Sequence, residues 1–160
     1  IPAQWVRVMP NIPASVGQAM SVAAVKQELG ANEKEILQFL LEAVGMVSWA
    51  EEADMDAVTA ISGSGPAYVF YLAECLAQAG EGLGLSSEQA SQYARQTIIG
   101  AGEMLRLSSK TPAQLRENVT SPQGTTEAAL QVFMEGEGLK KLMEKATKAA
   151  AKRSQELRGK

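Results

Sequence analysis

Residues 66–79 read PAYVFYLAECLAQA, and this stretch decides the fold class. Pro66 suits the first turn of a helix, because the N–H group that proline lacks would have no partner there. Beyond it, Glu74 and Gln78 are the only strongly polar side chains, so the helix is apolar nearly all round. A helix without a polar face belongs in the middle of a bundle, where other helices cover it.

Further helix signals lie on both sides of this segment. Three pairs have the spacing of a capping box, in which two residues three positions apart satisfy each other's free N–H groups. They are Asn32 with Glu35, Ser86 with Gln89, and Thr111 with Gln114. Together with the spacing of apolar residues, they predict helices at about residues 32–44, 53–61, 87–107, 112–118, 125–135 and 139–157. Because the connections are short, these helices predict an all-α fold, a helical bundle.

The N-terminal end of the chain has a different pattern. Residues 4–9 alternate like a short β-strand, and Pro10-Asn11-Ile12-Pro13 then breaks any regular structure. A short extended piece is expected at residues 46–49, but no segment is an evident partner for the strand. We therefore interpret residues 1–13 as a remnant strand and loop of another domain, and residues 14–160 as the helical domain.

Composition excludes several classes of protein. Apolar residues make up 46% of the 160 residues and charged residues 21%, as in ordinary globular domains. Cys75 is the single cysteine, so no disulfide can form within the chain, and no Cys/His cluster suggests a metal. Histidine is absent, which excludes Ser/His and Cys/His nucleophilic sites. No apolar run is long enough to cross a bilayer, so we expect a cytoplasmic protein without a membrane partner.

The net charge of −3 hides a basic C-terminal segment. Residues 139–160 carry eight Lys or Arg against two Glu, and a solvated face that complements the helix dipole is the simplest interpretation. The segment has no aromatic side chains to stack on bases. Nucleic acid is therefore not an expected partner.

Two loops of small residues precede expected helices. At Ser62-Gly63-Ser64-Gly65, free N–H groups could hold an anion, or the glycines could simply allow close packing. In the loop that ends at Thr126, the N–H groups of Gly124, Thr125 and Thr126 would point outward at a helix start, where a carboxylate fits. An ordinary N-cap by Thr125 or Ser121 is the alternative.

Acidic residues cluster before the helix expected at residues 53–61. They are Glu51, Glu52, Asp54 and Asp56. Acids near a helix N-terminus favour its dipole, so capping is one interpretation. A carboxylate that holds a protonated imine or secondary ammonium is the other.

Three segments, in order, match the hallmarks of one enzyme family. They are RVMPNIP at residues 7–13, DAVTAISGSGPAY at residues 56–68 and LRENVTSPQGTT at residues 115–126. The chain resembles the pyrroline-5-carboxylate reductases over essentially its whole length, and the third segment lies on the family signature. One departure is Gln123, where many members have glycine.

The resemblance implies an oxidoreductase that reduces 1-pyrroline-5-carboxylate to L-proline with NADPH or NADH, the last step of proline biosynthesis. It implies that residues 1–13 are left from an N-terminal Rossmann domain, which binds most of the cofactor. Residues 14–160 are then a helical bundle of the 6-phosphogluconate dehydrogenase C-terminal-like type, which forms a homodimer or higher homo-oligomer. On this interpretation the chain alone is inactive.

The resemblance also implies roles for single residues. Thr126 is the implied catalytic residue, with its hydroxyl facing the ring nitrogen of the substrate and Glu52 near that nitrogen. The residues implied at the substrate are Glu52, Val119, Ser121, Gly124, Thr125 and Thr126. Those implied at the cofactor are Pro10, Asn11 and Asn118.

Two other interpretations stay open. A two-domain dehydrogenase acting on a hydroxy acid would place a catalytic lysine in a helix that faces the nicotinamide, and residues 66–79 contain none. A non-enzymatic helical dimerisation module is the second, because the chain contains no cofactor fingerprint of its own.

Overall fold

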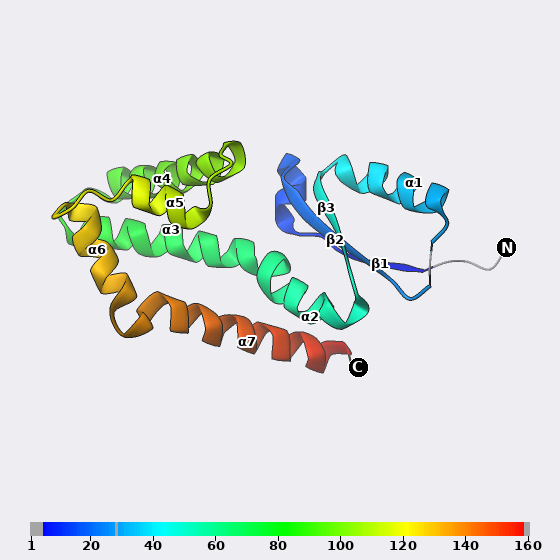
Figure 1. Cartoon of the computed structure of the whole chain (residues 1–160). Helices are drawn as coiled ribbons and strands as arrows, with labels where there is room; N and C mark the ends of the chain where they lie inside the picture. Colours follow the sequence, from blue (N-terminus) through cyan, green and yellow to red (C-terminus); the bar gives the residue numbers. More distant parts are fainter. Residues whose placement is uncertain (1–4, 28, 159–160) are drawn as a thin grey trace. The chain divides into compact units, whose positions relative to one another are not determined.

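The computed structural model describes residues 5–27 and 29–158 (Figure 1). They form two compact units. The N-terminal unit comprises the described parts of Ile1–Tyr68 and Lys145–Lys160, and the helical unit comprises Val69–Glu144.

A three-stranded sheet organises the N-terminal unit (Figure 1). Its elements are β1 (Val6–Met9), η1 (Ile12–Val16), β2 (Ala19–Val25), α1 (Ala31–Glu42), β3 (Gly45–Ala50), η2 (Glu52–Asp54), α2 (Met55–Val58) and η3 (Thr59–Gly63). The strand order is β1-β2-β3, with β2 antiparallel to β1 and parallel to β3. Helix α1 connects the two parallel strands, as such a pair requires.

The core of the N-terminal unit lies around the central strand, β2. Its buried residues are Ala19, Ser21, Val22, Ala23 and Ala24. Val22 and Ala24 pack against Met55 at the start of α2, which is fully buried. Because β2 is covered on both faces, small side chains replace the alternation of apolar and polar residues that marks a half-buried strand.

The small residues of β2 explain why the sequence did not reveal a partner for the first strand. The strand expected before Pro10 is confirmed as β1, and the extended piece at residues 46–49 is confirmed within β3. The expectation that β1 has no partner in the chain is wrong, because Val8 pairs with Ala23 in β2. Residue 4, the first of the expected strand, lies outside the described residues.

The structure of the helix N-termini shows which of the three expected capping boxes form. The boxes at Ser86 and Thr111 are confirmed by reciprocal hydrogen bonds with the residues three positions on. The box expected at Asn32 is wrong, because α1 begins one residue earlier, with Gly30 as its N-cap and no side-chain bond. Asn32 is therefore inside the helix, where it cannot cap.

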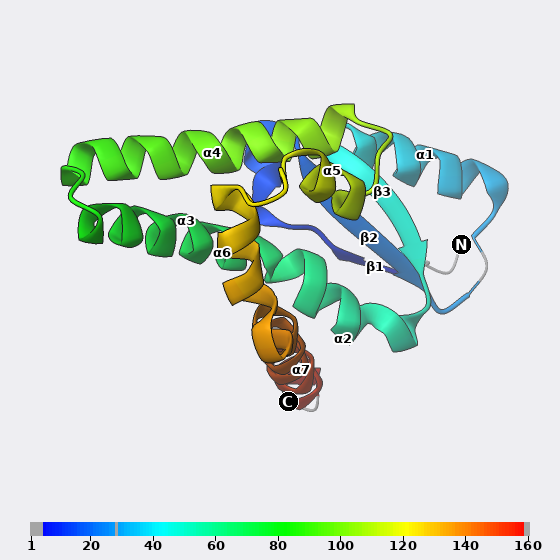
Figure 2. The same ribbon diagram turned by 60° about the vertical axis from the view of Figure 1, so that its left-hand side comes forward.

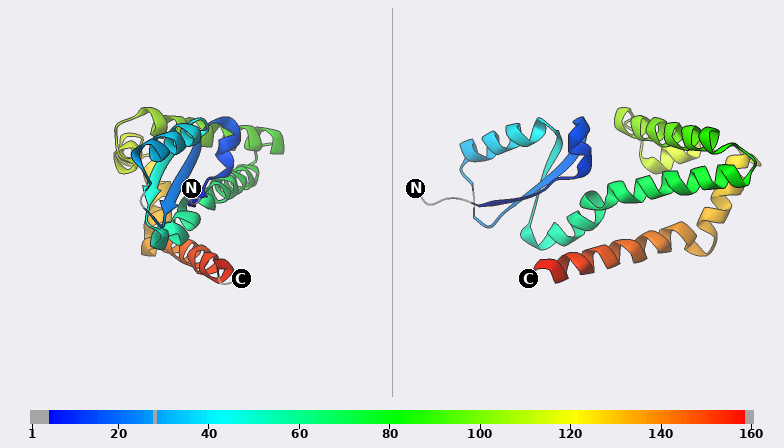
Figure 3. Two further views of the ribbon diagram at one scale, coloured as in Figure 1. Left: turned by 90° about the vertical axis from the view of Figure 1, so that its right-hand side faces the viewer. Right: turned by 180° about the vertical axis from the view of Figure 1, so that it is seen from behind.

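Helices dominate the rest of the chain, as the sequence predicted. They are α3 (Gly65–Gly82), α4 (Ser87–Leu107), α5 (Pro112–Asn118), α6 (Thr125–Met134), η4 (Glu135–Glu137) and α7 (Gly138–Arg158). Helices α3 and α4 lie side by side (Figure 2). They approach closely at Gly80, where an added Cβ would lie only 3.2 Å from the Cβ of Ala90. The chain bends between α6 and α7 at Gly136, which has a positive φ of 58° (Figure 3).

The apolar side chains of α3 remain at the surface of this chain. Val69, Phe70, Tyr71, Leu72 and Leu76 are between 42% and 65% exposed. The sequence places such a helix in the middle of a bundle, so a single copy leaves the bundle open.

Among residues 5–27 and 29–158, no helix combines the length and hydropathy needed to span a bilayer. The same residues contain no group of three His, Cys, Asp or Glu side chains that could hold a metal ion.

Candidate functional site

The loop between α5 and α6 is shaped by its own hydrogen bonds. After α5 ends, the hydroxyl of Thr120 donates to the carbonyl of Arg116 at 2.6 Å. A tight turn follows, in which the N–H of Gly124 donates to the carbonyl of Ser121 at 3.0 Å. Helix α6 then begins at Thr125, as the sequence predicted.

Two positions in this turn have unusual backbone requirements. Gln123 has a φ of 60°, a left-handed conformation that strains any residue with a Cβ. Its N–H donates to a carboxylate oxygen of Glu127 at 2.6 Å. A Cβ at Gly124 would lie 2.4 Å from the hydroxyl oxygen of Ser121, so a side chain there would require Ser121 to move. A glycine in place of Gln123 would adopt the left-handed conformation without backbone strain.

The start of α6 presents free donors. Its N-cap is Gly124 and no side chain caps it, so the alternative of an ordinary N-cap by Thr125 or Ser121 is wrong. Among the described residues, the N–H groups of Thr125 and Thr126 have no acceptor, as is usual in a first helical turn. The N–H of Gly124 is not free, contrary to expectation, because it closes the turn with Ser121.

Thr126 adds a hydroxyl to these amides. Its side chain is half-buried, and within residues 5–27 and 29–158 the hydroxyl has no hydrogen-bond partner. Two amides and one hydroxyl of consecutive residues are therefore free at the helix N-terminus, where the helix dipole favours an anion. The arrangement can hold a carboxylate and still offer a donor or acceptor to a neighbouring atom.

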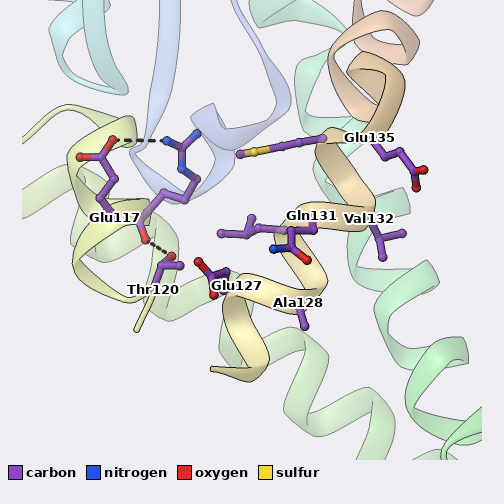
Figure 4. A pocket seen from close by; sticks show the side chains of 10 residues that line it. Glu117, Thr120, Glu127, Ala128, Gln131, Val132 and Glu135 are labelled. Carbon is purple, nitrogen blue, oxygen red and sulfur yellow. Dashed lines mark hydrogen bonds and ion pairs between the residues drawn. The ribbon is translucent and has the colours of Figure 1, made fainter. Parts of the chain in front are cut away.

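A hollow of about 780 Å³ lies beside this loop, between α5 and α6 (Figure 4). Glu117, Glu127 and Glu135 line it together with one cation, Arg116. Because carboxylates outnumber cations, this hollow does not suit an anionic substrate. The free amides of α6 are a better match for a carboxylate.

The expected site residues fall into two groups. Asn118, Val119, Ser121, Gly124, Thr125 and Thr126 lie together in the helical unit, on the end of α5, the loop and the start of α6. Pro10, Asn11 and Glu52 lie in the N-terminal unit. The roles that the resemblance implies for all of them stay predictions.

Side-chain contacts in the N-terminal unit occupy two of these residues. The Nδ2 of Asn11 donates to the carbonyl of Ser62 at 3.0 Å, and its Oδ1 accepts from the N–H of Met20 at 2.9 Å. Glu52 forms an ion pair with Arg7 at 2.5 Å. The contacts of Glu52 with Arg7 and of Asn11 with Ser62 were not predicted from the sequence, because they join residues far apart along the chain.

The acidic cluster before α2 does not cap helices through its side chains. Glu51 and Asp54 hold N-cap positions without a side-chain hydrogen bond. Asp56 is buried, and it accepts a hydrogen bond from Ser154 at 2.8 Å and pairs with Arg158. Its role is therefore to attach α7 to α2.

The small-residue turn at Ser62–Gly65 takes part in backbone hydrogen bonds of its own. The N–H of Ser64 donates to the carbonyl of Thr59, and the N–H of Ala67 donates to the carbonyl of Ser64. Gly63 packs against Met9, whose Sδ would lie 3.4 Å from an added Cβ. Of the two interpretations of this turn, the contacts favour close packing over an anion site.

Displaced pKa values occur away from the loop. The hydrogen bond from Arg106 lowers the pKa of the Glu103 carboxyl. A hydrogen bond with Cys75 raises the pKa of Tyr71. Both pairs lie on helix surfaces, so these shifts reflect local pairing.

Comparison with known proteins identifies a family that includes the loop between α5 and α6 in its matched region. The family model for pyrroline-5-carboxylate reductase dimerisation matches residues 52–157. A pyrroline-5-carboxylate reductase of Pseudomonas aeruginosa is 48% identical over 98% of this chain and 57% of its own length. The chain belongs to the pyrroline-5-carboxylate reductase family. This finding confirms the family resemblance that the sequence indicated.

Solved structures of the family agree with this fold. A pyrroline-5-carboxylate reductase from Coxiella burnetii matches with a TM-score of 0.91 and 39% identity, over 97% of this chain and 57% of that one. A Plasmodium falciparum pyrroline carboxylate reductase with NADP bound matches with a TM-score of 0.83 and 34% identity, over 94% of this chain and 60% of that one. The chain thus spans a little over half the length of these relatives.

One residue at the loop was missed in the sequence interpretation. Glu127 holds the strained turn by accepting from the N–H of Gln123. An acidic residue in the first turn of an expected helix, three positions after its N-cap, is a signal that could have identified it.

Proposed function

We propose that this chain is the substrate-binding and dimerisation portion of an enzyme that reduces 1-pyrroline-5-carboxylate to L-proline. The observation that carries the proposal is the start of α6, where two free amides and the unpartnered hydroxyl of Thr126 lie together on the family signature. The family match over residues 52–157 supports it. A cytoplasmic location fits this function.

The loop residues provide the chemistry of binding and orientation. The N–H groups of Thr125 and Thr126, with help from Ser121, hold the carboxylate of the substrate at the positive end of the helix dipole. This anchor places the ring nitrogen beside the hydroxyl of Thr126, which keeps the proton of the iminium oriented. Glu52 and Val119 stay in the proposal as further substrate residues on resemblance alone.

NADPH or NADH, when bound, supplies the hydride that reduces the C=N bond. The glycine-rich turn at Ser62–Gly65 is a poor match for the phosphates of a dinucleotide, because the N–H of Ser64 already donates to the carbonyl of Thr59. Asn118 is exposed at the end of α5, and Pro10 is exposed beside Asn11. These residues would contact the nicotinamide end, and most of the binding would come from a separate domain.

A second copy of the chain is the proposed partner. The apolar side chains of α3 are exposed, and the matched family model describes a dimerisation domain. A homodimer would cover α3 with the helices of the other copy. The open bundle would then be closed.

The test joins this chain to the part of the Pseudomonas aeruginosa relative that lies outside the matched region. The fusion is expected to oxidise NADPH or NADH only when pyrroline-5-carboxylate is present, and to form proline. The chain alone and the relative's part alone are the controls, and both are expected to be inactive. A folded, dimeric fusion without this activity would contradict the proposed function.

A further inference from the structure

The helical segment that leads into α3 contains a π-turn, η3. Here the N–H of Ser64 donates to the carbonyl of Thr59, five residues earlier, at 2.8 Å. A π-turn interrupts the α-helical hydrogen-bond pattern, and such turns recur at functional sites. Two carbonyl groups in this region lack their usual donors, one because of the π-turn and one because of Pro66.

The carbonyl of Ala60 is the first. Its α-helical donor would be the N–H of Ser64, which is already bonded to Thr59. The hydroxyl of Tyr68 donates to Ala60 instead, at 3.0 Å. Because Ala60 is only 2% exposed, an unpaired carbonyl there would be costly.

The carbonyl of Ser62 is the second. Its donor would be residue 66, and Pro66 has no N–H group. The Nδ2 of Asn11 takes that place at 3.0 Å, while the Oδ1 of the same amide accepts from the N–H of Met20. One side chain thus joins the loop after β1, the start of β2 and the π-turn.

Both ends of the Asn11 amide therefore serve the protein itself. Building on the reductase function proposed above, we propose that Asn11 and Tyr68 are positioning residues for the reaction. Tyr68 stabilises the π-turn itself, and Asn11 joins that turn to the loop after β1, so that Pro10 and the backbone beside it present a fixed edge to the nicotinamide. Asn11 then acts through the turn, and not through a hydrogen bond from its side chain to the cofactor.

Two substitutions and one matched control test this in the fusion protein. Tyr68→Phe removes only the hydroxyl, and Asn11→Asp keeps the acceptor for Met20 while removing the donor to Ser62. Tyr93→Phe is the control, because the hydroxyl of Tyr93 in α4 has no partner among the described residues. Each test variant should lower kcat roughly 10- to 100-fold, the range expected for a small misplacement of reacting groups.

The pattern of effects separates positioning from other roles. KM for pyrroline-5-carboxylate should change little, because its carboxylate is held by a different loop. The double variant should be no slower than the slower single variant, since both side chains hold one turn. A loss of kcat in Asn11→Asp with normal kinetics in Tyr68→Phe would indicate direct contact of Asn11 with the cofactor and overturn the proposal. Normal kinetics in both would overturn it as well.

Amide hydrogen exchange of the chain alone tests, without an activity assay, whether the hydrogen bonds of Asn11 and Tyr68 stabilise the π-turn. These two hydrogen bonds are called the brace below. Tyr68→Phe and Asn11→Asp should each accelerate exchange at Ser64 roughly 5- to 10-fold, and Tyr93→Phe should not. Unchanged exchange at Ser64 would refute the brace whatever the fusion does. Faster exchange together with an inactive unsubstituted fusion would refute the reductase function and the positioning role, and leave the brace supported.

Discussion

The two units of the molecule differ in the contacts that stabilise each of them internally. In the N-terminal unit, side chains join residues far apart in sequence, as in the Arg7–Glu52 ion pair and the Ser154–Asp56 hydrogen bond. In the helical unit, hydrogen bonds such as Arg106 to Glu103 connect neighbouring turns of one helix. The N-terminal unit buries most of β2, whereas Ala90 and Ala94 are the only buried residues of the helical unit.

This difference indicates where the missing core of the helical unit comes from. Helices α3 and α4 leave a groove of about 810 Å³ between them, whose lining combines apolar side chains such as Phe70 and Ile98 with polar ones such as Glu74 and Arg95. Exposed apolar side chains gathered in this way and rimmed by polar ones mark a surface that binds another protein or a ligand. We infer that the helical unit completes its core with a second copy, while the N-terminal unit has its own.

The largest expected effect is on association. Phe70→Asp places a carboxylate in the groove between α3 and α4, so it should weaken dimerisation roughly 100-fold or more. Sedimentation velocity of the chain over a concentration series measures this. Phe39→Asp is the matched control, because Phe39 in α1 is also largely exposed but belongs to the N-terminal unit. If both variants dimerised equally well, the helical unit would not differ from the N-terminal unit in needing a second copy.

The next effect is on the attachment of α7. Asp56→Ala removes the buried carboxylate that Ser154 and Arg158 contact, which should cost about 1–3 kcal/mol of unfolding free energy. Urea denaturation measures the loss. Asp54→Ala is the control, since Asp54 is exposed and its side chain has no hydrogen bond at the N-cap. Similar losses in the two variants would mean that Asp56 makes no specific contribution.

The smallest effect concerns the strained turn. Gln123→Gly relieves the left-handed conformation at φ 60° but increases the freedom of the unfolded chain, so the net gain should be at most about 1 kcal/mol. Gln123→Ala keeps the strain and should give no gain. Thermal unfolding compares the two. A gain with alanine as large as that with glycine would show that the strain is not the cause.

Local signals in the sequence predicted much of this fold. The capping boxes at Ser86 and Thr111 are confirmed, and each is a local signal between residues three positions apart. Strand β2 was missed because its small, doubly buried residues show no period of two. Sequence alone therefore found elements with a local signature and missed the one defined by its neighbours.

The candidate site divides in the same way. The helix start at Thr125 and its free amides follow from the small residues of the loop, whereas the roles of Glu52 and Thr126 rest on family resemblance. The contacts of Asn11 with Ser62, 51 residues away, have no sequence pattern that would reveal them. Long-range hydrogen bonds of this kind become visible only in the folded chain.

Thr126→Ala in the fusion protein tests the central claim most directly. The substitution removes one hydroxyl at the ring nitrogen and keeps the backbone amides that hold the carboxylate, so kcat should fall roughly 10- to 1000-fold. The melting temperature should stay nearly constant, because α6 is capped by Gly124 and not by a threonine side chain. Unchanged kcat with a lowered melting temperature would contradict the account.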